Sequence, residues 1–241
     1  AADFRRGAAQ AARRLGELDR EAEHPNGTMP GMRLGQHHLL VRYLRIGEDG
    51  MRFYAFGITP NHDNAKPRRH AVLWANPKKR AEIARRMFAK RFPNVDVHQH
   101  SVAELRGMEG LRVRAKYAEL GVEYGVTWKG REYDKSNWNL ADNINRALSA
   151  ANASLYAVCA AVCCSLGYVP SLGFIHDGGT LPFIYDVADL YKAITSFPAA
   201  FQAVRQDPAD HGELVRTLLK ERIEEERLLQ NMPKDLEQLV Q

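Results

Sequence analysis

One stretch in the second half of the chain concentrates residue types that can bind a metal ion. It contains His176, then the glycine pair 178–179, and then Asp186 and Asp189. The glycine pair predicts a loop that exposes the His176 imidazole. The two aspartates lie three positions apart in a segment of helical spacing, which puts both carboxylates on one helix face. Imidazole nitrogen with carboxylate oxygens suits Mn²⁺, Mg²⁺ or Zn²⁺, and a set rich in oxygen favours Mg²⁺ or Mn²⁺ over zinc. The same residues could instead form a local charge network at the surface.

Capping signals predict the helices that precede this stretch. Asn76 followed by Pro77 is typical of a helix start. Ser101 with Glu104 forms a capping box, so we expect a helix there that carries Glu109 on a rigid element. The apolar face of the first helix would consist of Ile83, Met87 and Phe88, and that of the second of Leu105, Met108, Leu111 and Val113 or Ala115.

Apolar spacing predicts a long core helix from about residue 142 to residue 166. Gly167 would end it, and the two aspartates would follow on a helix over Phe183–Lys192. Two more helices are expected at Ala199–Arg205 and Glu213–Leu229. The apolar run of the core helix is too short to span a bilayer, so we expect a buried helix. Its cysteines have no C-x-x-C spacing, which favours buried free thiols over a metal or redox site.

The first part of the chain has a different pattern. Residues 1–24 predict a charged helix or arm, and Leu39–Ile46 and Met51–Gly57 predict two short strands around a GEDG turn. Arginines interrupt the N-terminal alanines before an apolar core region can form, so no secretory signal peptide is indicated. We therefore expect a cytoplasmic protein.

The chain carries a formal net charge of +5, and this charge is distributed unevenly. Residues 66–91 contain ten Lys or Arg and one acid, whereas residues 207–241 contain five bases and nine acids. A block of positive charge suits a polyanion, because Lys and Arg displace counterions from phosphates. By composition alone, the same block could instead be a solvated basic helix face that binds no polyanion.

Several segments together resemble the family of CRISPR-associated integrases and endonucleases, the catalytic subunits of the complex that inserts new spacers. In chain order these segments are RGMEGLRVRAKYA, GVTWKGREYDKSNW, DNINRALSAANASLY, GFIHDGGTLPFIYDVADLYK and the following FPAAF. The resemblance covers about residues 50–206 and is greatest to the branch of subtype I-E. Separate motifs in the family's order make a chance agreement improbable.

The resemblance implies a small N-terminal β domain and a larger all-α catalytic domain. We therefore expect a mainly α catalytic domain with a small N-terminal β remnant, α+β overall. The β part would occupy residues 1–57 with MRFYAFG as its last strand, a linker residues 58–76, and the α domain residues 77–241. The family's β domain is longer than this first segment, so we expect a β part that is truncated, replaced, or lost to a wrong start or reading frame. Because the family forms its homodimer through that domain, we expect only weak dimerisation.

The resemblance also implies the site and the reaction. Glu109, His176 and Asp189 would ligate a catalytic Mg²⁺ or Mn²⁺ ion, and Asp186 would support them. A DNA 3′-hydroxyl would attack a phosphodiester at the border of a repeat. The implied partners are double-stranded DNA, as spacer precursor and as repeat array, and a small ferredoxin-like companion subunit.

A further set of residues would contact DNA. Basic side chains are expected to follow phosphates, and aromatic rings to hold a frayed base. Taken alone, such aromatic residues are more typical of half-buried core positions. The expected contacts are Arg52, Arg85, Arg86, Lys90, Arg91, Arg112, Tyr133, Trp138, Tyr156 and Arg216.

Two other functions are compatible with parts of the sequence. His176 followed by Asp177 imitates the dyad of all-α HD-type metal phosphohydrolases, although that dyad normally lies on helices with additional histidine ligands. The second alternative is a DNA-binding scaffold that has kept the fold without catalysis.

Overall fold

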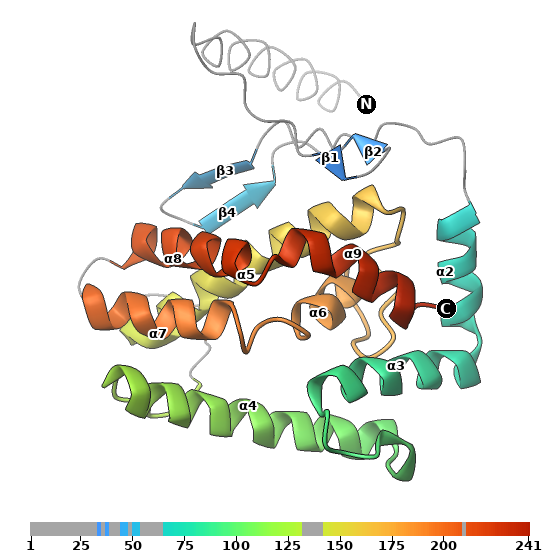
Figure 1. Ribbon diagram of the computed structural model, residues 1–241, viewed down its shortest axis with the longest axis horizontal. Coiled ribbons are helices and arrows are strands. Elements are labelled where there is room, and N and C mark those ends of the chain that lie inside the picture. The colour runs from blue at the N-terminus through green and yellow to red at the C-terminus, as the bar shows by residue number, and fades with distance from the viewer. Residues whose placement is uncertain are drawn as a thin grey trace, which may run out of the picture.

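The computed structural model describes residues 33–34, 37–38, 44–47, 50–53, 65–131, 142–208 and 211–241. These residues are mainly helical, as predicted, and the C-terminus lies beside α2 (Figure 1). In chain order the helices are α2 (Ala65–Ala75), α3 (Pro77–Arg91), the 3-10 turn η1 (Val97–Gln99), α4 (Val102–Tyr124), α5 (Asn143–Ser165), α6 (Pro182–Ala188), α7 (Ser196–Gln206), α8 (Gly212–Glu225) and α9 (Leu228–Leu239).

Short strands precede the helices in the chain. β1 (Arg33–Leu34) pairs with β2 (His37–His38), and β3 (Leu44–Gly47) pairs with β4 (Gly50–Phe53), both antiparallel. The register places Gly47 opposite Gly50, which confirms the hairpin expected around the GEDG turn. β4 also contacts α5, so the hairpin lies against the helical part of the chain.

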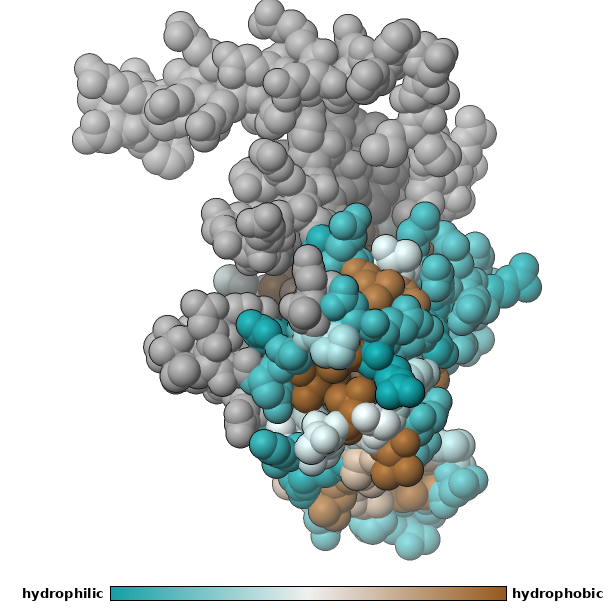
Figure 2. All heavy atoms as spheres, turned by 90° about the vertical axis from the view of Figure 1, so that its left-hand side faces the viewer, coloured by the Kyte–Doolittle hydropathy of each residue, from teal (hydrophilic) through white to brown (hydrophobic). Residues whose placement is uncertain are grey.

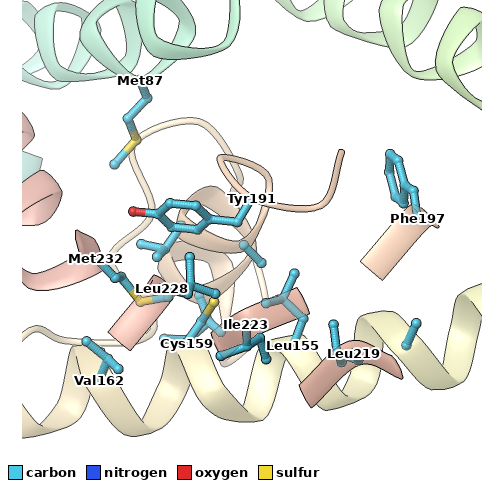
Figure 3. Packing of buried hydrophobic residues seen from close by; sticks show 14 of the residues in the cluster. Met87, Leu155, Cys159, Val162, Tyr191, Phe197, Leu219, Ile223, Leu228 and Met232 are labelled. Carbon is cyan, nitrogen blue, oxygen red and sulfur yellow. The ribbon is translucent and has the colours of Figure 1, made fainter. Parts of the chain in front are cut away.

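α5 is the central helix of the bundle, as its apolar spacing predicts. It contacts α6, α7, α8 and α9. Figure 3 shows residues of α5 pointing toward residues of α8 and α9, among them Leu155, Cys159, Val162, Ile223, Leu228 and Met232. α5 is also the one helix of the described ranges that is long and apolar enough by composition to cross a membrane. Here that apolar surface forms the core.

The predicted helix starts are confirmed by their hydrogen bonds. Asn76 accepts from the backbone N–H groups of residues 78 and 79 at 3.1 Å each. Ser101 and Glu104 form the reciprocal capping box of α4, and Asp142 caps α5 by accepting from Asn145 N at 2.8 Å. α4 ends at Gly125, which has a left-handed φ of 65°. Glycine adopts this conformation without strain because it has no Cβ. The helix that carries Glu109 is therefore fixed at both ends.

Three expectations about helices are wrong. The helix expected over Phe183–Lys192 is shorter, because α6 ends at Ala188 and Asp189 is its C-cap. Leu111 was expected on the apolar face of α4 but is 63% exposed, because the buried face of that helix runs through Leu105, Tyr117 and Leu120. The single helix expected over 213–229 is two helices, because Arg227 adopts a positive φ of 49° between α8 and α9.

The linker expected at residues 58–76 is also partly wrong, because residues 65–75 form α2. This helix is short and basic, and only His70 and Leu73 are buried on it, so it lacks a long apolar pattern. α2 packs against α3. The domain division itself stays a prediction.

The surface mixes hydrophilic and hydrophobic residues. On the face in Figure 2 the hydrophobic residues form patches separated by hydrophilic ones. In the described part of the chain the most exposed large apolar side chains are Val72, Leu111, Val122 and Ile194, and they lie on different elements or far apart on one helix. These four side chains therefore form no continuous docking face.

Candidate functional site

A buried carboxylate holds the loop that carries His176. Asp186 on α6 is 0% exposed and accepts hydrogen bonds from the backbone N–H groups of Phe174 at 2.6 Å, Ile175 at 3.0 Å and His176 at 2.8 Å. The His176 ring contacts the same carboxylate through Nδ1 at 2.7 Å. Because a carboxylate only accepts, the proton of the neutral ring lies on Nδ1, and Nε2 keeps its lone pair. Asp186 therefore fixes both the position and the tautomer of His176.

The free nitrogen of His176 faces a second carboxylate. Nε2 lies 3.8 Å from Asp189 Oδ2, at the end of α6. Lys192 Nζ lies 2.6 Å from the other oxygen of Asp189. Burial alone would raise the pKa of Asp189, but the charges of Lys192 and Arg91 outweigh it and hold that pKa below its usual range. Asp189 is therefore an anion that faces His176.

Glu109 approaches the same place from α4. The Arg91 guanidinium lies between the two acids, with Nη1 4.0 Å from Glu109 Oε1 and 3.8 Å from Asp189 Oδ2. Its Nη2 donates to the Asp186 backbone carbonyl at 3.0 Å. Glu109 also pairs with Arg112 at 3.3 Å. Arg91 was expected to contact DNA phosphates, and this expectation is wrong because its side chain is only 1% exposed and lies beneath the acids.

The donor set fits a divalent cation in type. His176 Nε2 and Asp189 Oδ2 lie 3.8 Å apart. Two atoms at this distance can bind the same ion, because each metal–ligand bond would be about 2.0–2.6 Å long. Among the residues that the structure describes, however, no three His, Cys, Asp or Glu side chains stand close enough to hold an ion as they are placed. Arg91, Arg112 and Lys192 are the cations that contact the carboxylates here. Shared coordination by Glu109, His176 and Asp189 thus stays a prediction.

A cavity of about 610 Å³ opens beside these acids. Glu109 and Asp189 lie on its wall, and basic and aromatic side chains complete it. Tyr117 contacts the rings of Trp128 and Phe197, with centroids 4.7 Å and 4.5 Å away. The basic residues of the wall are Arg112, Arg114, Arg131 and Lys192. Such a wall suits an anion with a flat aromatic part, such as a nucleotide.

Sequence reasoning missed several residues of this site. Lys192 lies three positions after Asp189, and that helical spacing could have identified it as a partner of the carboxylate. Arg131 reaches the site from a segment without helical pattern and donates to Asn145 and Ser149 of α5. No local signal in the sequence points to this long-range contact.

The other expected DNA contacts are distributed over several elements. Arg85 donates to the His100 carbonyl at 3.3 Å, Arg86 contacts Glu82 and the Leu239 carbonyl, and Lys90 pairs with Asp235 at 2.6 Å. Arg112 lines the cavity, Tyr156 packs edge-on against Tyr185 near Lys192, and Arg216 lies on α8. Arg52 lies on β4. Tyr133 and Trp138 lie outside the described residues.

Asp177, the residue after His176, has partners outside the group of His176, Asp186 and Asp189. The Asp177 carboxylate lies 3.5 Å from Arg80 and its side chain is 75% exposed. It also accepts from Gly178 N. His176 is therefore paired with Asp186 and Asp189, and the arrangement differs from a dyad made of His176 and Asp177.

Comparisons with known proteins identify the family of the chain. A family model described as CRISPR associated protein Cas1 matches residues 78–226. CRISPR-associated endonuclease Cas1 2 from Thermus thermophilus is 42% identical over 215 residues, which make up 86% of this chain and 66% of the relative. CRISPR-associated endonuclease Cas1 from Escherichia coli is 42% identical over 171 residues, or 71% of this chain and 56% of the relative.

The similarity extends to three dimensions. A crystal structure of a TtCas1–DNA complex is 44% identical, with a TM-score of 0.73 over 79% of this chain and 71% of that chain. A Cas1 protein from Thermotoga maritima, at 16% identity, has the same fold with a TM-score of 0.58. The chain spans about two thirds or less of the length of these curated relatives. It belongs to the CRISPR-associated protein Cas1 family.

Proposed function

We propose that this chain carries the catalytic centre of a metal-dependent DNA integrase and endonuclease. It would join a short DNA to a CRISPR repeat array by attack of a 3′-hydroxyl on a phosphodiester, whose own 3′-oxygen leaves as a hydroxyl. The observation that carries the proposal is the orientation of His176, whose Nδ1 is anchored on Asp186 while Nε2 faces Asp189. The relatives named as endonucleases and the TtCas1–DNA complex support it.

Each residue of the catalytic centre would have a different role. Glu109, His176 and Asp189 would hold Mg²⁺ or Mn²⁺, and the ion would supply charge neutralisation at the phosphate and activation of the hydroxyl. Asp186 would keep His176 oriented and its Nε2 free of a proton. Arg91 carries a permanent charge beneath Glu109 and Asp189, which reduces the repulsion between these carboxylates before an ion binds.

The cavity beside the acids would hold the reacting DNA end. Arg112, Arg114 and Arg131 on its wall can pair with phosphate oxygens, because each guanidinium is a fork of donors. Trp128 and Tyr117 offer ring surface on which a base could stack. The chain would thus position the reacting DNA end next to the acids, and the chemistry needs no covalent bond to the protein.

The proposed partners follow from the family. They are double-stranded DNA, as spacer precursor and repeat array, and a small ferredoxin-like companion subunit. A homodimer is the family arrangement. Because the chain spans only part of its curated relatives, these partners are proposals for this chain.

The test is strand joining on a labelled DNA duplex and a repeat-containing target with Mg²⁺ or Mn²⁺. We expect joined product with the unchanged chain, none after addition of EDTA, and none with His176→Ala. DNA affinity of that variant should stay within about twofold, because the chemistry and most phosphate contacts lie on different residues.

Two outcomes would contradict the proposal. If the unchanged chain binds DNA and joins no strands with either ion, it is a DNA-binding scaffold. If it hydrolyses nucleotides and Asp177→Ala abolishes that hydrolysis, the HD-type phosphohydrolase is the better description.

A further inference from the structure

His70 is a buried histidine that the catalytic proposal does not use. It lies on α2, is 1% exposed, and makes its hydrogen bonds to residues about a hundred positions further along the chain. Its Nδ1 accepts from the backbone N–H of Val169 at 3.1 Å, and its Nε2 donates to the carbonyl of Leu172 at 2.9 Å. Both ring nitrogens are therefore committed to one backbone segment.

That segment leads directly into the loop of His176. Residues 169–172 are the last part of the connection from α5 to Gly173, and Phe174 begins the three consecutive N–H groups that bind Asp186. The His70 ring also packs against Phe174 and Phe183, with centroids 5.2 Å and 4.6 Å away. The loop is thus held at two places, by His70 before Gly173 and by Asp186 after it.

Gly173 lies between these two anchors in a closely packed place. A Cβ at this residue would lie 2.6 Å from the His176 carbonyl oxygen and 2.6 Å from Pro182 Cβ. The backbone therefore passes between the His176 loop and α6 in close contact. A displacement of residues 169–172 would also disturb α6, because Phe183 N donates to the Pro170 carbonyl at 2.9 Å and α6 carries the Asp186 carboxylate that holds His176.

The chemical type of residue 70 suits this task. The segment presents one N–H donor and one carbonyl acceptor, and a neutral imidazole offers an acceptor and a donor on opposite sides of a rigid ring. Burial lowers the pKa of His70 to about 4, so the ring stays neutral near neutral pH and each nitrogen keeps its role. A leucine would fill a similar space without either bond.

We propose that His70 is a positioning residue for the metal centre, which holds the segment 169–172 and thereby aims His176 Nε2 at Asp189. This inference rests on the proposed function, because it assigns His176 to metal binding. It predicts that a change at residue 70 alters ion binding at residues it does not touch.

The experiment compares His70→Leu and His70→Gln with Leu73→Ala. Leu73 lies on the same helix, is 5% exposed, and belongs to the apolar core, so its truncation is a matched control for loss of α2 packing. Mn²⁺ affinity would be measured by electron paramagnetic resonance, and stability by urea unfolding. The Nδ1–H signal of His176 would be followed in ¹⁵N-histidine spectra without metal and assigned by its absence in His176→Ala.

We expect His70→Leu to weaken Mn²⁺ binding by about tenfold or more, which is the size of effect typical of residues that orient metal ligands. The His176 Nδ1–H signal should exchange faster with water or broaden. Leu73→Ala should change neither readout by more than about twofold at similar loss of stability. His70→Gln should restore part of the affinity, because its amide can still donate to Leu172.

Wild-type Mn²⁺ affinity and an unchanged His176 signal in His70→Leu would overturn the inference. Equal losses in Leu73→Ala would also overturn it, because the effect would then be general destabilisation. If His70→Leu fails to fold, the comparison of His70→Gln with Leu73→Ala decides. If His176→Ala binds Mn²⁺ as well as the unchanged chain, the proposed metal centre is wrong, and the metal-free His176 signal still tests the positioning role.

Discussion

The two histidines near this centre show that hydrogen-bond partners decide what a residue can do. His176 has one nitrogen fixed by Asp186 and the other facing Asp189, which leaves it free to bind a ligand. His70 binds the backbone through both nitrogens and is buried, so its role is limited to positioning other residues. The local sequence around His176, with its glycines and spaced aspartates, predicted the first role, whereas nothing near His70 indicated the second.

The burial of His70 has a consequence for stability at acid pH. Its pKa is about 4 in the folded protein, below the ordinary value near 6.5 that the unfolded chain would have. The unfolded state therefore binds the proton first, and stability is lost as the pH falls from about 6.5 towards 4. At pH 5 this loss is about 2 kcal/mol. Urea unfolding at pH 7.5 and pH 5 should show a smaller decrease for His70→Gln than for the unchanged chain. Equal decreases would show that His70 is already charged in the folded state.

Replacement of Asp186 and replacement of Glu109 should lower the free energy of unfolding by different amounts. Asp186→Asn replaces an acceptor oxygen by a donor among buried N–H groups, so we expect a loss of about 2–4 kcal/mol in the free energy of unfolding and weaker Mn²⁺ binding. Glu109→Gln should weaken Mn²⁺ binding with a stability change of about 1 kcal/mol or less, because its amide oxygen can still accept from the partly exposed Arg112. Urea unfolding without metal, followed by Mn²⁺ titration, separates the two. A larger stability loss for Glu109→Gln would reverse the roles assigned here.

At the scale of elements, the sequence predicted what is local and periodic. α3, α4 and α5 were recognisable because each has a capping residue and a repeated apolar spacing. α2 was taken for a linker because it buries only two residues, and the break before α9 has neither Gly nor Pro to mark it. The position of Glu109 in the site came from family resemblance alone. The place of Arg91 beneath the acids was missed, because its partners lie on α4 and α6 and its charge was counted as part of the basic segment.

The close passage at Gly173 can be tested with a matched glycine. Gly173→Ala would place a methyl group 2.6 Å from the His176 carbonyl oxygen and from Pro182, so we expect a loss of about 1–3 kcal/mol and weaker Mn²⁺ binding. Gly107→Ala is the control, since this glycine lies inside α4 and a Cβ there meets nothing within 4 Å. It should raise stability by about 0.5–1 kcal/mol, because alanine favours the helix. Thermal and urea unfolding of both variants measure these changes in stability. If Gly173→Ala is as stable as the unchanged chain, the loop has room for a Cβ.

At the scale of the whole molecule, the count of basic residues overstates the charge available to DNA. The acidic end of the chain folds back on the basic segment, where Asp235 pairs with Lys90 and Glu237 with Lys66. Arg85 and Arg86 are occupied by backbone carbonyls, so their replacement would disturb the fold as well as the charge. Lys78 and Lys79 at the start of α3 are exposed, and within the described ranges neither forms an ion pair.

Lys78 and Lys79 should therefore contribute more to DNA binding than Lys90. If both contact phosphates, Lys78→Gln with Lys79→Gln should weaken DNA binding and lower the slope of log affinity against log salt by about two. Lys90→Gln, whose charge is already balanced by Asp235, should change the slope by less than about 0.5. Fluorescence anisotropy of labelled duplex over a salt series gives both quantities, with His176→Ala as the variant that should bind with an unchanged slope. The same slope change in Lys90→Gln as in the double variant would show that the pairing with Asp235 does not neutralise this part of the basic segment.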